Sequence, residues 1–232
     1  MEYNGYKVCS EHPQFDIEWC KDVFKEIWVD HEYSRHGVFI EEGDIVIDCG
    51  ANIGLFTNYA LKQRKAKHVY SFECDELYFE TLNQNVNENV TTIKAFVSDR
   101  DEAGHYNVDK MLSEFNLFYI DFMKVDIEWW EYPLLINMPD NTMKKINKWV
   151  IELHDIYNNS EKILEIIEKF TINGFDIKYE QVHKNTNLAL LYTKKRLWKF
   201  AKYTLDVEFQ YHHLIGGLLK KLFGNSPKTL GC

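Results

Sequence analysis

A short glycine-containing loop carries the most specific chemical signal in the sequence. Asp48, Gly50, Asn52 and Gly54 lie in the run DCGANIG at residues 48–54, directly after an apolar stretch and before a helical pattern. Glycines at such a turn let the backbone bend tightly and approach a ligand without an intervening Cβ atom. A dinucleotide-binding turn would need glycines at 50, 52 and 55, but positions 52 and 55 hold Asn and Leu. The loop predicts a site for another ligand, or else an ordinary tight turn between a strand and a helix.

The acid-x-Gly-x-Asn-x-Gly spacing is close to the nucleotide loop of S-adenosylmethionine enzymes. That cofactor has no phosphates, so Asp48 can organise the loop and approach the cofactor's ammonium group. Glu73 ends the next apolar run, 23 residues after Gly50, near the offset of an acid that accepts hydrogen bonds from ribose hydroxyls. Ser98 and Asp99 follow the third run, where we expect contact with the adenine amino group. For Glu73 and for Asp99, the alternative is a surface acid that is solvated and contacts no ligand.

The elements that position these residues alternate between short apolar runs and helical patterns, which is typical of a parallel sheet with helices on both faces. We expect strands at 44–48, 68–72, 91–97, 119–126 and 148–153, and helices at 54–64, 76–86, 108–116, 130–137 and 160–171, the last with Ser160 as N-cap. Strands at 175–180 and 187–192 follow with only a short loop between them, so they should pair antiparallel. A mostly parallel seven-stranded sheet ending in such a hairpin predicts an α/β, Rossmann-like class I methyltransferase fold.

Several segments, taken together and in this order, resemble the FkbM family of methyltransferases. They are 43–61 with the GANIG loop, 69–86, 108–115, 120–135 with KVDIE, and 150–155. The family is described as transferring a methyl group from S-adenosylmethionine to a hydroxyl oxygen, often on sugars or polyketide-like products. The resemblance implies cofactor-binding roles for Asp48, Gly50, Asn52, Gly54 and Glu73, and places Lys124, Asp126 and Glu128 at the border of the transfer site.

Two positions depart from the family pattern. Cys74 stands where a proline usually follows the ribose-binding acid, and we expect Cys74 beside the cofactor pocket, as a small buried thiol like Cys49. Trp129 stands where glycine is expected in the family's acid-x-Glu-Gly-x-Glu motif. Its ring either walls the acceptor pocket, as a platform for a sugar, or occludes that pocket.

Removal of a proton from a hydroxyl acceptor requires a base near the methyl group. Asp126, Glu128 and His154 are the candidates, with Lys124 beside them, and His154 ends the fifth predicted strand. Ligands of open α/β sheets lie beyond the carboxyl ends of the strands, at the point where the strand order reverses. We therefore expect Asp48, Glu73 and Asp126 to converge on one crevice.

The same sheet edge offers a set of possible metal ligands, namely Asp126, Glu152, His154 and Asp155. Oxygen and imidazole donors of this kind suit a divalent cation. No ligand spacing in the sequence requires such a site, and the prediction is that no metal binds.

The charge balance separates the body of the chain from its tail. The formal net charge is −9, yet residues 194–232 carry eight Lys and Arg against two acids. An acidic body argues against duplex nucleic acid as a partner, because phosphate neutralisation supplies most of that affinity. Basic and bulky apolar residues alternate at 195–223, which predicts packing on the body or self-association, with peripheral contact with an anionic membrane as the alternative.

These patterns predict three regions: a helical cap at 1–40, a methyltransferase domain at 41–193 and a basic amphipathic extension at 194–232. The sequence has no apolar stretch of about 18 residues and no secretory signal at its N-terminus. Its five scattered cysteines are typical of a reducing compartment. The expected location is the cytoplasm, or the inner face of the membrane for a peripheral protein.

The leading functional hypothesis is O-methylation of a hydroxyl on a glycan, sugar or small-molecule acceptor, with S-adenosylmethionine as cofactor. The alternative is a non-catalytic S-adenosylmethionine-binding or interaction protein whose acceptor site is filled by Trp129. A nicotinamide-dependent oxidoreductase is a third hypothesis, which the missing glycine pattern at residues 50–55 disfavours.

Overall fold

A computed structural model describes residues 2–8, 17–182 and 186–196 of the chain. The chain divides into two compact units, Met1–Arg196 and Leu197–Cys232, and only the first contains described residues. Nearly all of the predicted basic extension, including the segment 195–223 beyond Arg196, therefore lies outside the described residues. None of the helices in the described part combines the length and apolar character needed to cross a membrane.

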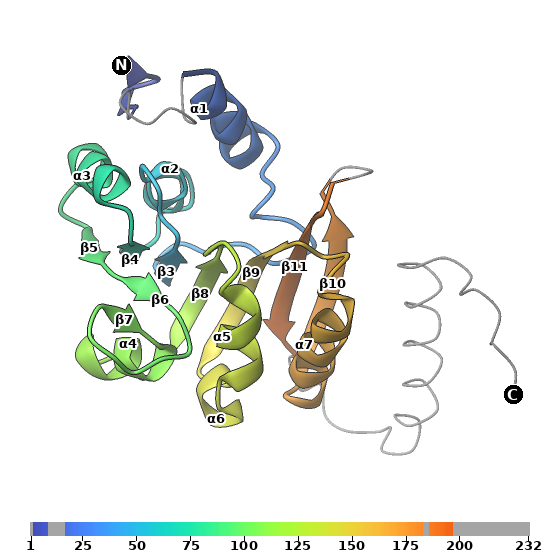
Figure 1. Cartoon of the computed structure of the whole chain (residues 1–232). Coiled ribbons are helices and arrows are strands. Elements are labelled where there is room, and N and C mark those ends of the chain that lie inside the picture. The colour runs from blue at the N-terminus through green and yellow to red at the C-terminus, as the bar shows by residue number, and fades with distance from the viewer. Residues whose placement is uncertain (1, 9–16, 183–185, 197–232) are drawn as a thin grey trace, which may run out of the picture. The chain divides into compact units, whose positions relative to one another are not determined.

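The central sheet has seven strands in the order β10-β11-β9-β8-β3-β4-β5 (Figure 1). They are β3 (Ile45–Cys49), β4 (His68–Glu73), β5 (Val90–Lys94), β8 (Ile120–Val125), β9 (Ile146–His154), β10 (Phe175–Gln181) and β11 (Leu188–Lys195). Strand β11 is antiparallel to both of its neighbours, whereas β3, β4, β5, β8 and β9 pair in parallel. The predicted α/β, class I methyltransferase fold with its terminal antiparallel hairpin is confirmed.

Two small sheets accompany the central one. Strands β1 (Glu2–Tyr3) and β2 (Tyr6–Lys7) pair antiparallel, and β6 (Phe96–Val97) pairs in parallel with β7 (His105–Tyr106). The single strand predicted at 91–97 is therefore two strands, because the chain leaves β5 after Lys94 and pairs with β7 instead.

Helices cover both faces of the sheet, as the nearly continuous burial of its central strands requires. One face carries α4 (Val108–Glu114), α5 (Glu131–Asn137), α6 (Asp140–Met143) and α7 (Ser160–Ile172), packed on Ile47, Met123 and Trp149. The other carries α1 (Ile17–Phe24), η1 (Lys25–Val29), α2 (Leu55–Asn58), η2 (Tyr59–Gln63) and α3 (Glu76–Asn85). Residues of α1, η1, α2, η2 and α3 form a buried cluster with Val46, Phe122 and Val150 of the strands.

Two predicted helices differ in detail from the observed ones. The helix expected at 54–64 is a short α-helix, α2, that continues as the π-helical turn η2. Helix α7 begins at Ser160, but its N-cap is Asn159, which makes no side-chain capping bond. The prediction of Ser160 as the cap was therefore wrong by one residue.

Strand register brings ionisable side chains onto one face at the carboxyl ends of the strands. Asp48 of β3 is paired in register with Lys124 of β8, and Val125 with Ile151 of β9. Since successive side chains in a strand alternate between faces, Asp48 and Lys124 lie on the face opposite to Ile47 and Met123. Asp126, Glu152 and His154 continue the same alternation along β8 and β9.

Gly50 lets the ends of β3 and β8 approach each other. Its φ is +77°, and a Cβ atom there would lie 1.7 Å from the carbonyl oxygen of Asp126. The Asp126 amide donates to the Cys49 carbonyl at 3.1 Å, and Lys124 Nζ donates to the Gly50 carbonyl at 2.9 Å. No side chain can be accommodated at residue 50 without separating these two strand ends.

We predict that Gly50→Ala lowers the free energy of unfolding by about 2–4 kcal/mol, through left-handed strain and a backbone clash. Gly104→Ala is the matched control, because Gly104 has φ +80° and no atom within 4 Å of an added Cβ. Urea unfolding of both variants separates the clash from the backbone strain. Equal losses in the two variants would show that the approach of Asp126 to Gly50 is unimportant.

Candidate functional site

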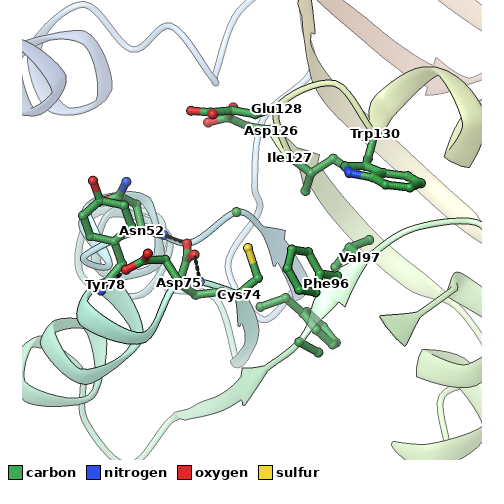
Figure 2. Close-up of a pocket in the computed structure, with 14 residues that line it drawn as sticks. Asn52, Cys74, Asp75, Tyr78, Phe96, Val97, Asp126, Ile127, Glu128 and Trp130 are labelled. Atoms are coloured by element: carbon green, nitrogen blue, oxygen red, sulfur yellow. Dashed lines mark hydrogen bonds between the residues drawn. The ribbon is translucent and has the colours of Figure 1, made fainter. Parts of the chain in front are cut away.

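A first cavity of about 320 Å³ lies beyond the carboxyl ends of β3, β4 and β8 (Figure 2). Four of the predicted cofactor-binding residues line it: Gly50, Asn52, Glu73 and Cys74. Other lining residues come from β6, from the start of α3 and from the N-cap of α5, and include Asp75, Tyr78, Phe96, Val97 and Trp130. Its place at the edge where β3, β4 and β8 end is the ligand position expected for this class of sheet.

Glu73 links the glycine loop to the end of β4. The Glu73 side chain is buried, and its Oε2 atom accepts a hydrogen bond from the Asn52 amide at 2.8 Å. Its Oε1 atom accepts from the Asp75 amide at 2.8 Å. Burial raises the pKa of Glu73, although these backbone donors oppose the rise. The carboxylate is held in one orientation at the cavity wall, with lone pairs still available to a ligand.

Four predicted cofactor-binding residues line neither this cavity nor the second cavity described below. Asp48 is fully buried and accepts a hydrogen bond from Thr57 Oγ1 at 2.7 Å. Gly54, with φ +88°, packs against Leu82. These two residues lie behind the loop, and their contact with the cofactor stays a prediction.

Ser98 and Asp99 also lie away from the cavity. Ser98 is buried and bonded to His105 Nδ1 at 2.8 Å, while Asp99 accepts from Asn137 Nδ2 at 2.6 Å. The reason is that the chain turns into β6 before Ser98, so that Phe96 and Val97 line the cavity instead. The prediction of a continuous strand over 91–97 was wrong, and with it the expectation that Ser98 and Asp99 lie at the cavity wall.

Cys74 lines the cavity but is exposed, so the prediction of a buried thiol was wrong for Cys74 and right for Cys49. Partial burial and the Glu73 charge raise the pKa of Cys74 to about 11. The thiol therefore stays protonated near neutral pH and acts as a neutral wall residue.

A second cavity, of about 470 Å³, adjoins the first. Five residues line both cavities: Gly50, Asn52, Tyr78, Asp126 and Glu128. The second cavity is closed on its other sides by α1 and η1, by Tyr33 and Phe56, and by Lys124, Glu152 and His154. The predicted catalytic residues Lys124, Asp126, Glu128 and His154 are thus brought together in one place.

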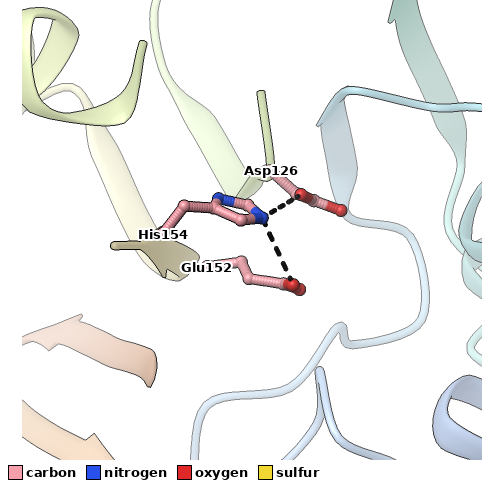
Figure 3. A group of neighbouring side chains, drawn as sticks. All are labelled: Asp126, Glu152 and His154. Atoms are coloured by element: carbon pink, nitrogen blue, oxygen red, sulfur yellow. Dashed lines mark ion pairs between the residues drawn. The ribbon is translucent and has the colours of Figure 1, made fainter. Parts of the chain in front are cut away.

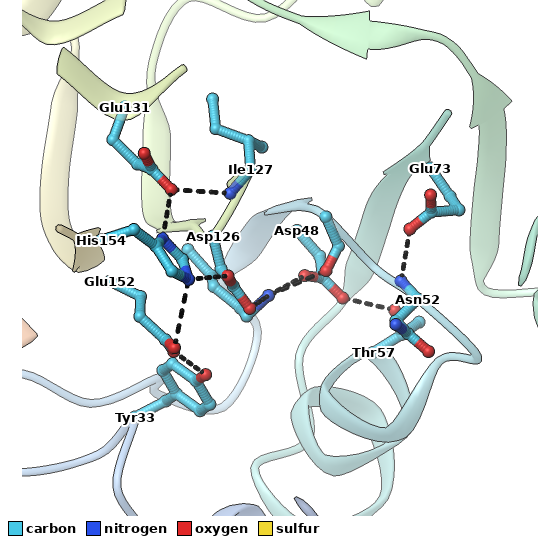
Figure 4. Close-up of polar contacts among 12 residues, drawn as sticks. Tyr33, Asp48, Asn52, Thr57, Glu73, Asp126, Ile127, Glu131, Glu152 and His154 are labelled. Atoms are coloured by element: carbon cyan, nitrogen blue, oxygen red, sulfur yellow. Dashed lines mark hydrogen bonds and ion pairs between the residues drawn. The ribbon is translucent and has the colours of Figure 1, made fainter. Parts of the chain in front are cut away.

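Asp126, Glu152 and His154 form a compact cluster in the second cavity (Figure 3). His154 Nε2 lies 3.9 Å from Asp126 Oδ1 and 3.7 Å from Glu152 Oε1. On its other side, His154 Nδ1 donates to Glu131 Oε1 at 2.8 Å (Figure 4). Because the fully buried Glu131 carboxylate fixes the ring, Nε2 is directed at the two carboxylates.

Burial and mutual charge shift the pKa values of this cluster. Burial and the Asp126 charge raise the pKa of Glu152 to about 8, although a 2.5 Å hydrogen bond from Tyr33 Oη opposes the rise. Burial lowers the pKa of His154, but the Glu131 hydrogen bond and charge outweigh it and raise the value to about 9. Near neutral pH, His154 is therefore an imidazolium, and the Glu152 carboxyl is poised to exchange a proton.

Lys124 joins the cluster to Asp48. Its Nζ atom lies 3.2 Å from Asp126 Oδ2 and 3.4 Å from Asp48 Oδ1. Burial lowers the pKa of Lys124, but the charges of Asp126 and Asp48 outweigh it and raise the pKa. Lys124 is thus held as a cation and cannot serve as a base. It positions Asp126 and the Gly50 carbonyl.

Trp129 fills neither of the two adjoining cavities. Its side chain is 62% exposed and lines neither of the two adjoining cavities. It lies over an outer groove, with its ring 6.5 Å from that of His154. The hypothesis of a site occluded by Trp129 was wrong, because the left-handed backbone at Glu128 (φ +39°) and Trp129 (φ +76°) turns the ring outward.

Only three of the four possible metal ligands named from the sequence lie close together in the structure. Asp126, Glu152 and His154 present ligand atoms within 4.8 Å of one another. Asp155 is not among them, because its carboxylate accepts hydrogen bonds from Asn158 and Asn187. The neighbouring ammonium of Lys124 already compensates Asp126 at 3.2 Å.

Sequence reasoning missed several residues of this site. Tyr33 comes from a loop with no recognisable motif, and only the structure shows that it reaches Glu152. Tyr78 lies in α3, and its position in the sequence indicates only the apolar face of a helix. Glu131 did carry a signal, because it matches the last acid of the motif in which Trp129 replaces glycine.

Fold and cavities together define a class I methyltransferase architecture. A family model described as FtsJ-like methyltransferase matches residues 20–138, half of the chain. The chain therefore belongs to the FtsJ-like methyltransferases, and the predicted FkbM-like, S-adenosylmethionine-dependent class is confirmed at the level of the family.

Two curated relatives are similar to parts of the chain. One is the 31-O-demethyl-FK506 methyltransferase FkbM of Streptomyces tacrolimicus, 40% identical over 63 residues, which cover 27% of this chain and 24% of that protein. Another is the AMB antimetabolite synthetase AmbE of Pseudomonas aeruginosa, 23% identical over 218 residues, covering 66% of this chain and 10% of the synthetase. The chain spans a quarter or less of the length of these relatives.

Solved structures share the fold. The methyltransferase FkbM of Methylobacillus flagellatus superposes with a TM-score of 0.54 at 19% identity, covering 73% of this chain and 47% of that one. A chain of the complex between the Haloferax volcanii Trm112 methyltransferase activator and a methyltransferase gives a TM-score of 0.50 at 10% identity, covering 76% and 93%. At these identities the likeness concerns the fold.

We predict that stability falls with rising pH because of His154. Its folded-state pKa of about 9 exceeds the ordinary value of 6.5, so its contribution is complete below pH 6.5 and is lost as pH rises through about 9. The expected loss is about 1–3 kcal/mol, measured by urea unfolding at pH 6 and pH 9.5. His154→Asn should show a smaller decline. Identical slopes in the variant and the wild type would contradict the assignment.

Proposed function

We propose that the protein is an S-adenosylmethionine-dependent O-methyltransferase acting on a hydroxyl of a sugar, glycan or other small molecule. The observation that carries this proposal is the junction of the two cavities at Gly50, Asn52, Tyr78, Asp126 and Glu128. Two reactants placed in adjoining cavities meet at that junction, and such positioning accounts for much of the rate of a bimolecular transfer.

The first cavity fits the proposed cofactor in its donor set. The Glu73 carboxylate suits ribose hydroxyls, and the bare backbone at Gly50 admits a ligand where a side chain would intrude. Phe96 and Val97 form an apolar wall suited to an adenine ring. When bound, S-adenosylmethionine would supply a methyl group on a positively charged sulfur, the electrophile of the reaction.

The second cavity supplies the groups for the acceptor. We infer that Glu152 would take up the proton that the acceptor hydroxyl loses when it receives the methyl group. Tyr33 holds this carboxyl by a hydrogen bond at 2.5 Å, and His154, fixed by Glu131, faces it at 3.7 Å. Asp126 and Glu128 border the transfer point, and Lys124 fixes Asp126.

The relatives support a small-molecule acceptor. The Streptomyces relative is a methyltransferase of 31-O-demethyl-FK506, and the Pseudomonas relative is an antimetabolite synthetase. The second cavity is lined by five acidic residues, Asp22, Glu26, Asp126, Glu128 and Glu152, of which all but Glu152 are expected to be charged near neutral pH. Such a wall repels phosphates, which disfavours nucleic acid as the acceptor.

We predict that Glu73→Gln weakens S-adenosylmethionine binding by about 10–100-fold, because a charged hydrogen-bond acceptor for the ribose is lost. Glu76→Gln is the control, since Glu76 lies on the surface in an ion pair with Lys94 and lines neither cavity. Isothermal titration with S-adenosylmethionine, and with NAD as a negative ligand, measures the effect. Tight NAD binding, or no S-adenosylmethionine binding by the wild type at millimolar concentration, would refute the proposed function.

We predict that turnover rises with pH as the Glu152 carboxyl ionises, because a base acts only when deprotonated and this pKa is about 8. Release of S-adenosylhomocysteine with a panel of hydroxyl acceptors provides the measurement. Glu152→Gln should lose about 10²–10⁴-fold in turnover. Tyr33→Phe should move the rise to higher pH, since the Tyr33 hydrogen bond lowers the pKa of Glu152. A profile that is unchanged in both variants would assign the base elsewhere.

A further inference from the structure

Glu131 is a buried acid that the methyl transfer proposed above leaves without a part. It is the first residue of α5, it is fully buried, and its side chain lines neither of the two adjoining cavities. A carboxylate loses its hydration in such a place, which is costly unless its partners compensate for the loss. The partners of Glu131 therefore indicate what the residue does.

Two donors from different elements converge on one oxygen of Glu131. The Oε1 atom accepts hydrogen bonds from His154 Nδ1 at 2.8 Å and from the Ile127 amide at 3.3 Å (Figure 4). His154 ends β9, whereas Ile127 lies in the turn between β8 and α5. His154 lines the second cavity and Ile127 lines the first. One buried atom thus joins a wall residue of each cavity.

The residue after Glu131 holds the main chain of His154. Tyr132 Oη donates to the His154 carbonyl at 2.6 Å, and the Tyr132 side chain is buried. Consecutive residues at the start of α5 therefore fix both the ring and the backbone of His154. With both fixed, His154 Nε2 keeps its place 3.9 Å from Asp126 Oδ1 and 3.7 Å from Glu152 Oε1.

The hydrogen bond to Ile127 bears on the left-handed turn that follows it. Glu128 and Trp129 have φ values of +39° and +76°, and such conformations persist only where surrounding contacts hold them. Glu131 provides a contact of this kind at the residue that enters the turn. Loss of that contact would free Glu128 to leave the wall that the two cavities share.

The other oxygen of Glu131 indicates that stability alone does not account for the residue. Its Oε2 atom is buried and has no hydrogen-bond partner within the part of the chain that the structure describes. A buried polar atom without a partner costs stability, and an apolar side chain of similar size would avoid that cost. The contribution of Glu131 is therefore the placement of the Ile127 and His154 donors.

We propose that Glu131 is a positioning residue, which holds the Ile127–Glu128 turn and His154 in a fixed relation across the junction of the two cavities. It acts on the transfer only through these residues and touches neither reactant. This inference rests on the proposed function, which assigns one cavity to the cofactor and the other to the acceptor. Fixed placement matters for such a reaction, because a displacement of about 1 Å can slow a transfer by about 10²-fold.

NMR of the ligand-free protein at pH 7 tests both contacts without either reactant. In the wild type, we expect the His154 Nδ1 proton and the Ile127 amide proton to exchange slowly with solvent. Glu131→Leu should abolish the slow histidine signal and speed exchange at Ile127 about tenfold or more, because no acceptor remains. Glu131→Gln, which keeps a side-chain oxygen in the same place, should retain both signals. His154→Asn assigns the histidine signal.

Thr142→Val is the matched control, because Thr142 is also buried, donates to Asp109 Oδ1 at 2.7 Å and lines neither cavity. It should leave both signals unchanged. Unchanged signals in Glu131→Leu, or their loss in Thr142→Val or Glu131→Gln, would overturn the proposal. If Glu131→Leu does not fold, Glu131→Asp replaces it. A side chain shorter by one methylene should lose the protection at Ile127, and an unchanged exchange rate there would also overturn the proposal.

Turnover separates this inference from the proposed function. Release of S-adenosylhomocysteine with the acceptor panel should show kcat about 10–100-fold lower in Glu131→Leu, with a smaller change in KM for S-adenosylmethionine, and a smaller loss of kcat in Glu131→Gln. Wild-type kcat in a Glu131→Leu protein that has lost both NMR signals would overturn the positioning role. A wild type that binds no S-adenosylmethionine refutes the proposed function, whereas the NMR signals still decide whether Glu131 holds the two residues.

Discussion

The whole site depends on the close approach of two parallel strands at their carboxyl ends. The backbone of β3 leaves Cys49 through a glycine that has no room for a side chain, because the Asp126 carbonyl occupies that space. Lys124 then bonds the Gly50 carbonyl and lies within 3.4 Å of both Asp48 and Asp126. The buried Lys124 ammonium thereby fixes both the Gly50 carbonyl in the glycine loop and the Asp126 carboxylate. Both cavities share a wall at this junction, which includes Gly50 and Asp126.

Burial of so many charges near one another is costly unless each is paired. In this site, each buried cation is paired with a buried carboxylate that does not line either cavity. Asp48 and Glu131, which are inaccessible to solvent, neutralise Lys124 and His154 from behind. The groups that face the cavities remain available to ligands. Mutual repulsion between Asp126 and Glu152 is then relieved by a raised pKa at Glu152, so that this carboxyl ionises only as pH rises through about 8.

Much of the fold was predictable from the sequence, because periodicity and turn residues act locally. The strand series, the final hairpin and the loop at residues 48–54 all follow from such patterns. Gly50, Asn52 and Glu73 were also placed correctly at one cavity, since the carboxyl ends of neighbouring parallel strands share an edge. Ser98 and Asp99 were misplaced because a local apolar run does not show that the chain leaves the sheet after Lys94 and pairs with β7.

Contacts between segments that are far apart in the sequence could not be predicted from local patterns. Tyr33 and Glu152 are 119 residues apart, and no short pattern records their hydrogen bond. The role of Asp48 was likewise not predictable, although its place in the loop was. Its position in the motif was correct, but its role depends on whether Lys124 pairs with it, which is decided by the register of β8 against β3.

The backbone at Glu128 and Trp129 explains how the tryptophan is tolerated at a glycine position. Left-handed φ values are costly for residues with a Cβ atom, by about 1–2 kcal/mol each, and two occur in succession here. The conformation places Glu128 at the wall shared by both cavities, while Trp129 is carried to the exposed outer groove. A right-handed turn would redirect both side chains. The strain at this turn therefore separates the two residues, keeping the acid inside the site and the ring outside it.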